Sequence, residues 1–183
     1  MADHTGVEIN NAGSQPIIDA HAHVRVGVGV VVQSTGHQGL VLVGRRKGSH
    51  GSGSLALPGG HLESGETIAN CAVREIKEEC NLDLDATSVR LVGVTQDVFP
   101  EPARKHYVTL IVIAAVLPRS PPLQNMEPEK CVAWEWLSLE GLKERKTECF
   151  LPLQHALDTF LLRPGLLEDG LENGLRLNDC LQR

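Results

Sequence analysis

Aromatic residues are scarce in this 183-residue chain, and it has no long apolar run. Phe, Trp and Tyr together make up 3% of the residues, so the core has to consist mainly of aliphatic side chains. The longest apolar run, Leu110–Leu117, has eight residues. A membrane-spanning helix needs about 20 apolar residues, so we expect no membrane association.

Paired cysteines are missing as well. The five cysteines are an odd number and form no C-x-x-C motif; they are Cys71, Cys80, Cys131, Cys149 and Cys180. Disulfide frameworks and zinc sites use even numbers or paired spacings, so we expect reduced thiols. Residues 1–16 have neither the basic start nor the apolar segment of a secretory signal. These features favour a cytoplasmic protein.

The chain also lacks an excess of positive charge. It has 17 basic and 23 acidic side chains, a formal net charge of −6 at pH 7. Proteins that hold nucleic acid polymers or anionic membranes by long-range electrostatics are usually basic, so neither is an expected partner. A polyphosphate ligand would need a local source of positive charge, such as a metal ion or a few arginines.

The patterning predicts one mixed α/β domain over residues 24–163, preceded by a flexible arm (1–23) and followed by a tail (164–183). Apolar and β-branched runs predict strands at 24–32, 40–43, 55–57, 89–94, 108–116 and 131–137. The run at 108–116 is almost entirely apolar, which is typical of a strand buried on both faces.

Two helices are expected between and after these strands. The first runs from an N-cap at Thr67 to Cys80, and Asn81 can adopt the left-handed conformation that ends a helix. The second begins with Pro152 at its first position and ends at Pro164.

The first expected helix carries carboxylates on its apolar side. At about 100° per residue, Glu75 and Glu79 project within about 20° of Ile68, the centre of the apolar stripe, and Glu78 lies near its edge. A buried carboxylate costs several kcal/mol without a counter-charge. Arg74 alone cannot neutralise this group. Mg²⁺ prefers such oxygen clusters, completed by phosphate and water.

The alternative for this helix is an acidic, solvated face paired with Arg74 and Lys77. That alternative is weakened because the two central glutamates fall on the apolar side. Gly59 and Gly60, just before the helix, allow the backbone to approach closely and leave a carbonyl oxygen available as a further ligand.

These residues resemble the Nudix box, G-x5-E-x7-R-E-U-x-E-E-x-G-U, where U is apolar. The matching positions are Gly60, Glu66 and the run Arg74-Glu75-Ile76-Lys77-Glu78-Glu79-Cys80-Asn81-Leu82. One fixed position departs, because Asn81 stands where the family has glycine. The resemblance extends from about Val26 to Leu142. Within the family the chain is most similar to MutT-related nucleotide triphosphate diphosphatases, through Leu57–Glu63, Gly44–Gly48, His106–Thr109, Glu127–Lys130 and Trp134–Trp136.

The resemblance implies an α/β/α Nudix sandwich with a mixed sheet and a catalytic loop–helix–loop. It implies Mg²⁺-dependent hydrolysis of nucleoside triphosphates, natural or oxidised, to a monophosphate and pyrophosphate, with Mn²⁺ as an alternative metal. The implied metal ligands are Glu75, Glu78, Glu79 and the Gly59 carbonyl. Arg74 and Glu66 complete the implied catalytic set. A nucleotide is the implied partner, and related proteins are often homodimers.

The expected substrate contacts lie mostly outside the box, at Arg46, Arg45, Gly60, Leu57, Thr109 and Trp136. A solvated turn is the alternative for the two arginines, which end a strand before a Gly/Ser loop. Core packing is the alternative for Trp136 and for Trp134, which shares its strand face.

Other signals have competing interpretations. His106 and Tyr107 either line the pocket or pack. Asp19-Ala20-His21-Ala22-His23 resembles the D-x-H-x-H opening of metal-dependent amidohydrolases, but the chain is too short for the barrel that those enzymes need.

Two further functions stay open because the box reports the diphosphate and not the group attached to it. The first is a pyrophosphatase of a dinucleotide or nucleotide sugar, such as NADH or ADP-ribose. The S-Q-P-W-P-F-type segment of NADH-cleaving relatives does not follow the box, which weakens that alternative. The second is a non-catalytic nucleotide-binding module, which is disfavoured because Glu66, Glu75, Glu78 and Glu79 are all present.

Overall fold

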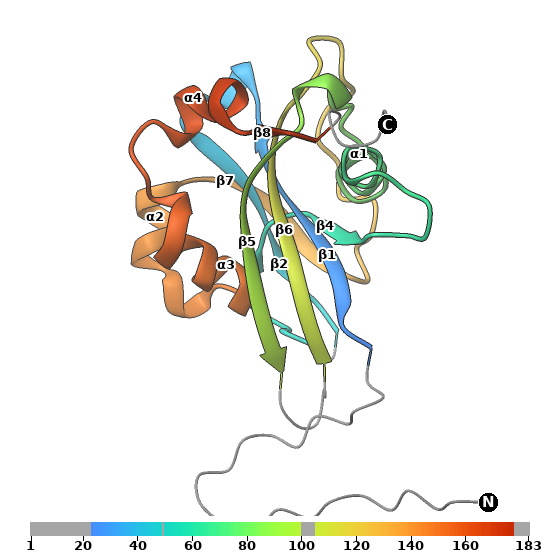
Figure 1. The fold of residues 1–183 in the computed structure, drawn as a ribbon, viewed down its shortest axis with the longest axis vertical. Helices are drawn as coiled ribbons and strands as arrows, with labels where there is room; N and C mark the ends of the chain where they lie inside the picture. The colour runs from blue at the N-terminus through green and yellow to red at the C-terminus, as the bar shows by residue number, and fades with distance from the viewer. Residues whose placement is uncertain (1–22, 49, 100–104, 178–183) are drawn as a thin grey trace, which may run out of the picture.

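The computed structural model describes residues 23–48, 50–99 and 105–177. Two β-sheets lie between helices, with α1 on one side and α2 and α3 on the other (Figure 1). The helices are α1 (Ile68–Cys80), α2 (Leu139–Glu144), α3 (Leu151–Ala156) and α4 (Leu166–Asn173), and the π-helical turn Leu157–Leu161 continues α3. The expected α/β/α sandwich is confirmed.

The larger sheet has five strands in the order β4-β1-β6-β5-β8, and the smaller sheet has the order β3-β2-β7. Their bounds are β1 Arg25–Gln33, β2 Leu40–Arg46, β3 Leu55–Ala56, β4 Gly59–His61, β5 Arg90–Phe99, β6 Lys105–Ala115, β7 Cys131–Ser138 and β8 Leu175–Arg176. Strands β1 and β6 are parallel and the other pairs are antiparallel, so the larger sheet is mixed, as expected.

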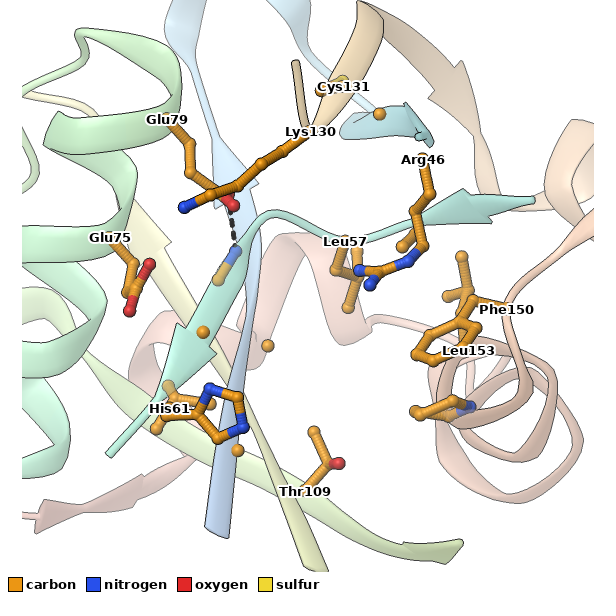
Figure 2. A pocket seen from close by; sticks show the side chains of 18 of the residues that line it. Arg46, Leu57, His61, Glu75, Glu79, Thr109, Lys130, Cys131, Phe150 and Leu153 are labelled. Atoms are coloured by element: carbon orange, nitrogen blue, oxygen red, sulfur yellow. Dashed lines mark hydrogen bonds between the residues drawn. The ribbon is translucent and has the colours of Figure 1, made fainter. Parts of the chain in front are cut away.

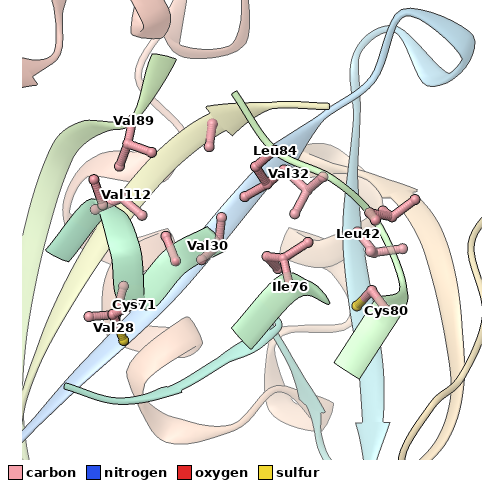
Figure 3. Packing of buried hydrophobic residues seen from close by; sticks show 14 residues of the cluster. Val28, Val30, Val32, Leu42, Cys71, Ile76, Cys80, Leu84, Val89 and Val112 are labelled. Carbon is pink, nitrogen blue, oxygen red and sulfur yellow. The ribbon is translucent and has the colours of Figure 1, made fainter. Parts of the chain in front are cut away.

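Successive side chains of the central strands pack into two separate cores. Val30 and Val32 of β1 point toward α1 and pack with Ile76, while Val31 points the other way (Figure 3). The same alternation holds in β6, where Val112 joins the α1 core. The apolar run at 108–116 therefore forms a strand whose central residues are buried on both faces, as its composition predicts.

Helix α1 has the caps that the sequence predicts. The Thr67 hydroxyl accepts a hydrogen bond from the Asn70 amide at 3.1 Å. Asn81 is left-handed, with φ 60° and ψ 10°, and its N–H donates to the Lys77 carbonyl. Asn tolerates this conformation better than most residues, which explains why the family's glycine can be replaced here.

Several elements differ from the prediction. The second helix begins at Leu151, which places Pro152 in its second position, and it turns π-helical after Ala156. Strands β4 and β8 and helices α2 and α4 were not expected, because each is too short for its periodicity to stand out. Of the expected tail, α4 and β8 are described, and β8 pairs with β5.

The expected N-terminal arm and its D-x-H-x-H motif lie almost entirely outside the described residues. The described part of the chain has no helix long and apolar enough to cross a membrane. The four described cysteines are buried free thiols, as predicted; they are Cys71, Cys80, Cys131 and Cys149.

Candidate active site

The box segment forms one wall of a cavity of about 550 Å³. Strand β4 runs beside α1 and presents two glycine backbones to it (Figure 2). A Cβ on Gly60 would collide with the Glu75 carboxylate. The amide of Gly59 donates to Glu79 Oε2 at 2.9 Å. The glycines therefore let the strand backbone lie directly against two carboxylates of the helix.

Gly59 also requires glycine for its own conformation. Its φ is 136°, and a Cβ there would collide with the Val28 carbonyl of the neighbouring strand. The turn that aims the Gly59 amide at Glu79 is therefore accessible only to a residue without a side chain.

Arg74 ties the other glutamates of this wall together. Its guanidinium donates to Glu66 Oε1 from Nε at 2.9 Å, to Glu75 Oε1 from Nη1 at 2.7 Å and to Glu78 Oε2 from Nη1 at 3.3 Å. The hydrogen bonds from Arg74 lower the pKa of Glu66 to about 2. The side chains of Glu66 and Glu75 are 13% and 14% exposed, whereas that of Glu78 is 55% exposed, at the rim.

Glu79 lacks such a partner. It is largely buried, and among the described residues no basic side chain forms an ion pair with it. Burial raises the pKa of Glu79 to about 7, and the nearby charge of Glu75 acts in the same direction. The Gly59 amide offsets only part of this effect. The charge of Arg46 also offsets part of it, so the wall holds a buried carboxylate that has no ion-pair partner among the described residues.

The donor set fits a hard divalent cation. Glu75 and Glu79 lie one helical turn apart and line the same cavity, and a cation there would supply the counter-charge that Glu79 lacks. No three acidic, His or Cys side chains of the described residues form a preformed metal cage. Mg²⁺ usually keeps several waters and takes substrate phosphate as a ligand, so two carboxylates suit it.

The facing wall is cationic and aromatic. Arg46 ends β2 and lies over the Phe150 ring, with its Cζ atom 4.5 Å from the ring centroid. Figure 2 shows Arg46, Phe150 and Leu153 across the cavity from the α1 glutamates. Burial lowers the pKa of Arg46, and the one hydrogen bond from its side chain to the described residues runs from Nε to the His50 carbonyl, at 3.3 Å. Its terminal nitrogens can therefore bind an anionic ligand.

Aromatic side chains concentrate around this cavity. The chain has six Phe, Trp and Tyr residues, and four of them line it: Phe99, Tyr107, Trp134 and Phe150. The Phe99 and Phe150 rings are stacked, with centroids 5.3 Å apart and planes 11° apart. His50 packs edge-on against both rings. Its buried Nε2 has no hydrogen-bond partner among the described residues.

The cavity collects most, but not all, of the residues expected from the sequence. Those that line it are Arg46, Leu57, Gly59, Gly60, Arg74, Glu75, Glu78, Glu79 and Thr109. Glu66 lies behind the wall, bound to Arg74. Of the two open cases, Tyr107 lines the cavity and His106 instead bonds Gln96.

Two expected substrate contacts lie elsewhere. Arg45 points to the surface and pairs with Glu148 at 3.1 Å, because neighbouring residues of a strand face opposite sides. Trp136 stacks on His37, with centroids 4.3 Å apart, outside the cavity. Trp134 lines the cavity in its place, and its Nε1–H donates to the Glu79 carbonyl at 3.2 Å.

The sequence did not single out His50, Phe99, Phe150 or Leu153. They come from a loop, the end of β5 and the start of α3, and no local pattern connects these segments. Lys130 also lines the cavity, where it binds Glu127 at 2.7 Å. Lys130 and Glu127 belong to the segment Glu127–Lys130, and its similarity to the MutT-related group was the only feature of the sequence that pointed to them.

A carboxylate-bearing loop–helix–loop that faces an arginine across an α/β/α sandwich is typical of hydrolases that act on phosphoanhydride bonds. Residues 23–153 match the family model of the NUDIX domain, and the chain belongs to the Nudix family. Nudix hydrolases bind nucleotide substrates and generally use divalent metal ions such as Mg²⁺ or Mn²⁺.

Characterised relatives in the family act on different compounds. The chain is 36% identical over 103 residues to the m7GpppN-mRNA hydrolase NUDT17 of Xenopus laevis, covering 49% of this chain and 32% of the relative. It is 34% identical over 97 residues to the ADP-ribose pyrophosphatase of Methanocaldococcus jannaschii, covering 53% and 54% respectively. The chain thus spans about a third and about half of these relatives.

Solved structures agree on the fold. A MutT Nudix hydrolase from Burkholderia pseudomallei aligns with a TM-score of 0.63 and 25% identity, over 74% of this chain and 97% of that one. A bifunctional NMN adenylyltransferase/ADP ribose pyrophosphatase from Francisella tularensis, in complex with AMP and a Mn ion, aligns with a TM-score of 0.57 and 23% identity, over 77% and 42%. The first relates the chain to MutT-type members, and the second shows the fold alone.

Proposed function

We propose that this protein hydrolyses nucleoside triphosphates to a monophosphate and pyrophosphate in the presence of Mg²⁺. The observation that carries the proposal is the division of the cavity into two walls. The α1 wall offers carboxylate oxygens, and the opposite wall offers Arg46 and aromatic rings. A nucleotide has the matching parts, a metal-binding polyphosphate and a flat base.

On this proposal Glu75 and Glu79 would hold the metal ion, and the Gly59 carbonyl and Glu78, from its position at the rim, could add ligands. When bound, Mg²⁺ would reduce the charge on the phosphates and lower the pKa of an associated water. Arg74 positions the Glu75 carboxylate by the 2.7 Å hydrogen bond between them. Glu66 holds Arg74 in turn, which makes it a positioning residue.

The facing wall would bind the rest of the nucleotide. The Nη groups of Arg46 would donate to phosphate oxygens, and the contact of the guanidinium with the Phe150 ring would limit its movement. Leu57, Phe150 and Leu153 give the apolar surface against which a base can pack. Thr109 lies at the same surface and can hydrogen-bond a base edge.

A second candidate is hydrolysis of a dinucleotide or nucleotide sugar, such as NADH or ADP-ribose, to two monophosphates. It is favoured by the 34% identity to an ADP-ribose pyrophosphatase. The α1 wall would act in the same way, because both reactions cleave a phosphoanhydride bond. The two reactions would differ in the part of the substrate that the facing wall binds.

The products distinguish the two candidates. Purified protein is incubated with Mg²⁺ and natural and oxidised nucleoside triphosphates, NADH, ADP-ribose and nucleotide sugars, and products are resolved by chromatography. Pyrophosphate and a monophosphate are the expected result. Two monophosphates from ADP-ribose or NADH would support the second candidate, and no product from any compound would contradict both.

A further inference from the structure

A buried acidic residue behind the aromatic wall has no role in the proposed reaction. Asp97 of β5 is 0% exposed, and it is the only charged residue in the buried class among those the structure describes. The Thr95 hydroxyl donates to Asp97 Oδ2 at 2.8 Å. On the other side His155 Nδ1 lies 2.6 Å from Asp97 Oδ1. A buried carboxylate is costly to the fold, and His155 is the basic side chain in contact with this one, although Oδ1 has no hydrogen bond among the described residues.

The pair belongs to a row of contacts that joins β5 to α3. Every second residue of a strand lies on one face, so Asp97 and Phe99 point the same way. Asp97 meets His155 and Phe99 stacks on Phe150, which precedes α3 directly. The Asp97–His155 pair is therefore next to the Phe99–Phe150 stack in this row, on the side away from the cavity.

At the far end of the row the strand and the helical segment are in direct contact. A Cβ on Gly93 would collide with the Phe160 ring, so this end is fixed by close packing. At the end that faces the cavity, Leu153 is buried in the core. The N–H of Phe150 donates to the Leu55 carbonyl at 2.7 Å, which anchors the backbone just before α3.

Helix α3 and its π-helical continuation are held mainly by apolar packing and have few polar anchors. The side chains that pack them into the core are Leu153, Ala156, Leu157, Phe160 and Leu161. Helix α3 has six residues, its N-cap Phe150 makes no side-chain cap, and it becomes π-helical from Leu157. The neighbouring Lys146–Asp158 ion pair is solvent-exposed, with side chains 38% and 50% exposed. Exposed pairs contribute little. Among the described residues, the Asp97–His155 pair is the ion-pair contact between side chains of this helix and β5.

We propose that Asp97 and His155 are positioning residues that hold α3 against β5, so that the Phe150 ring and the Leu153 side chain form the nucleoside-binding surface. This inference rests on the proposed function only in that the surface binds the nucleoside part of a nucleotide. The pair should therefore affect the affinity for substrate and leave the phosphate chemistry at α1 unchanged.

The kinetic test replaces the half-exposed partner. In His155→Ala, the KM for a nucleoside triphosphate should rise about tenfold with kcat within about twofold of wild type, because binding alone is weakened. His155→Asn keeps an N–H donor close to the position of Nδ1 and should restore most of the affinity. Lys146→Ala, which breaks the exposed ion pair of the same helical region, is the matched control and should leave KM unchanged.

A second measurement needs no substrate, so it separates this inference from the proposed function. The chain has three phenylalanines, and ring-labelled protein therefore gives three sets of aromatic NMR signals. Wild type should show a nuclear Overhauser effect between the Phe99 and Phe150 rings. His155→Ala should lose it and keep the Phe160 signals, and His155→Asn should retain it.

Persistence of the Phe99–Phe150 contact in His155→Ala would overturn the inference. So would an unchanged KM, or a fall in kcat with KM unchanged. If wild type hydrolyses no nucleotide, the proposed function fails, and the NMR comparison still decides whether the pair positions the ring.

Discussion

The two walls of the cavity are built in opposite ways. The α1 wall comes from one continuous segment, and its charged groups are paired through Arg74 or held by the backbone of β4. The facing wall brings together Arg46, His50, Phe99 and Phe150 from three distant parts of the chain. The buried guanidinium of this wall, that of Arg46, packs on the Phe150 ring.

This difference indicates a division of tasks. A short, densely hydrogen-bonded segment can hold carboxylates in a fixed geometry, which is what phosphoanhydride cleavage with a metal requires. A wall made of loop and element ends can change one residue at a time without disturbing that geometry. We therefore expect variants of the α1 wall to affect turnover and variants of the facing wall to affect substrate affinity.

The largest effect should come from Glu79. Glu79→Gln removes the buried carboxylate and keeps the shape of the side chain, so turnover should fall roughly a thousandfold with the fold intact. Steady-state hydrolysis with Mg²⁺ measures this effect. Glu140→Gln, on the exposed side of α2, is the control and should retain full activity. An active Glu79→Gln enzyme would remove Glu79 from the metal site.

Loss of the arginine that organises this wall should come second. Arg74→Ala leaves Glu66 and Glu75, both mostly buried, without a partner, so kcat should fall about a hundredfold and stability by about 2 kcal/mol at pH 7. Chemical denaturation measures the second effect.

The stability effect of Arg74 has a defined pH dependence. The folded-state pKa of Glu66 is lowered from 4.5 to about 2, so its stabilisation is present above pH 4.5 and is lost as the pH falls toward 2. The difference between wild type and Arg74→Ala should shrink over this range. A constant difference would show that Arg74 stabilises the fold by other contacts.

A smaller effect is expected on the facing wall, where two adjacent arginines give a matched pair. Arg46→Ala should raise KM about tenfold and change kcat little, since Arg46 lines the cavity and, on the proposed function, would bind ground-state phosphate. Arg45→Ala removes the same charge from a surface pair with Glu148 and should change neither constant by more than about twofold. Equal effects of both variants would indicate general electrostatics and contradict a specific contact.

The smallest effects should separate the two tryptophans. Trp134→Phe loses the hydrogen bond to the Glu79 carbonyl and should reduce kcat/KM about threefold, whereas Trp136→Phe should leave it unchanged. Fluorescence gives a second readout. Nucleotide binding should alter the emission of Trp134 in the Trp136→Phe protein and leave that of Trp136 unaltered in Trp134→Phe.

The α1 wall could be predicted from the sequence because its determinants are local. Helical spacing alone places Glu75 and Glu79 on the apolar side, and the caps at Thr67 and Asn81 have the expected geometry. The apolar run at 108–116 likewise predicts a strand buried on both faces. In each case neighbouring residues determine the result.

The facing wall could not be predicted in this way. Phe99 and Phe150 come together only because β5 and the start of α3 are packed side by side, which depends on the whole sandwich. The choice between Trp134 and Trp136 failed for a related reason. Both lie on one face of β7, and the register with β2 determines which of them reaches the cavity. Arg45 was expected in the site because spacing along the chain does not reveal which side of β2 faces the cavity.

The central claim is that Glu79 is a buried carboxylate whose counter-charge is a divalent cation. Its pKa is raised from 4.5 to about 7, so without metal the stability of wild type should fall between these pH values, by about 3 kcal/mol relative to Glu79→Gln. The most direct measurement is thermal unfolding of both proteins at pH 5 and pH 8, with and without Mg²⁺. We predict that Mg²⁺ raises the Tm of wild type strongly at pH 8 and weakly at pH 5, and has little effect on Glu79→Gln. An equal rise in both proteins, or none in wild type at pH 8, would contradict the claim.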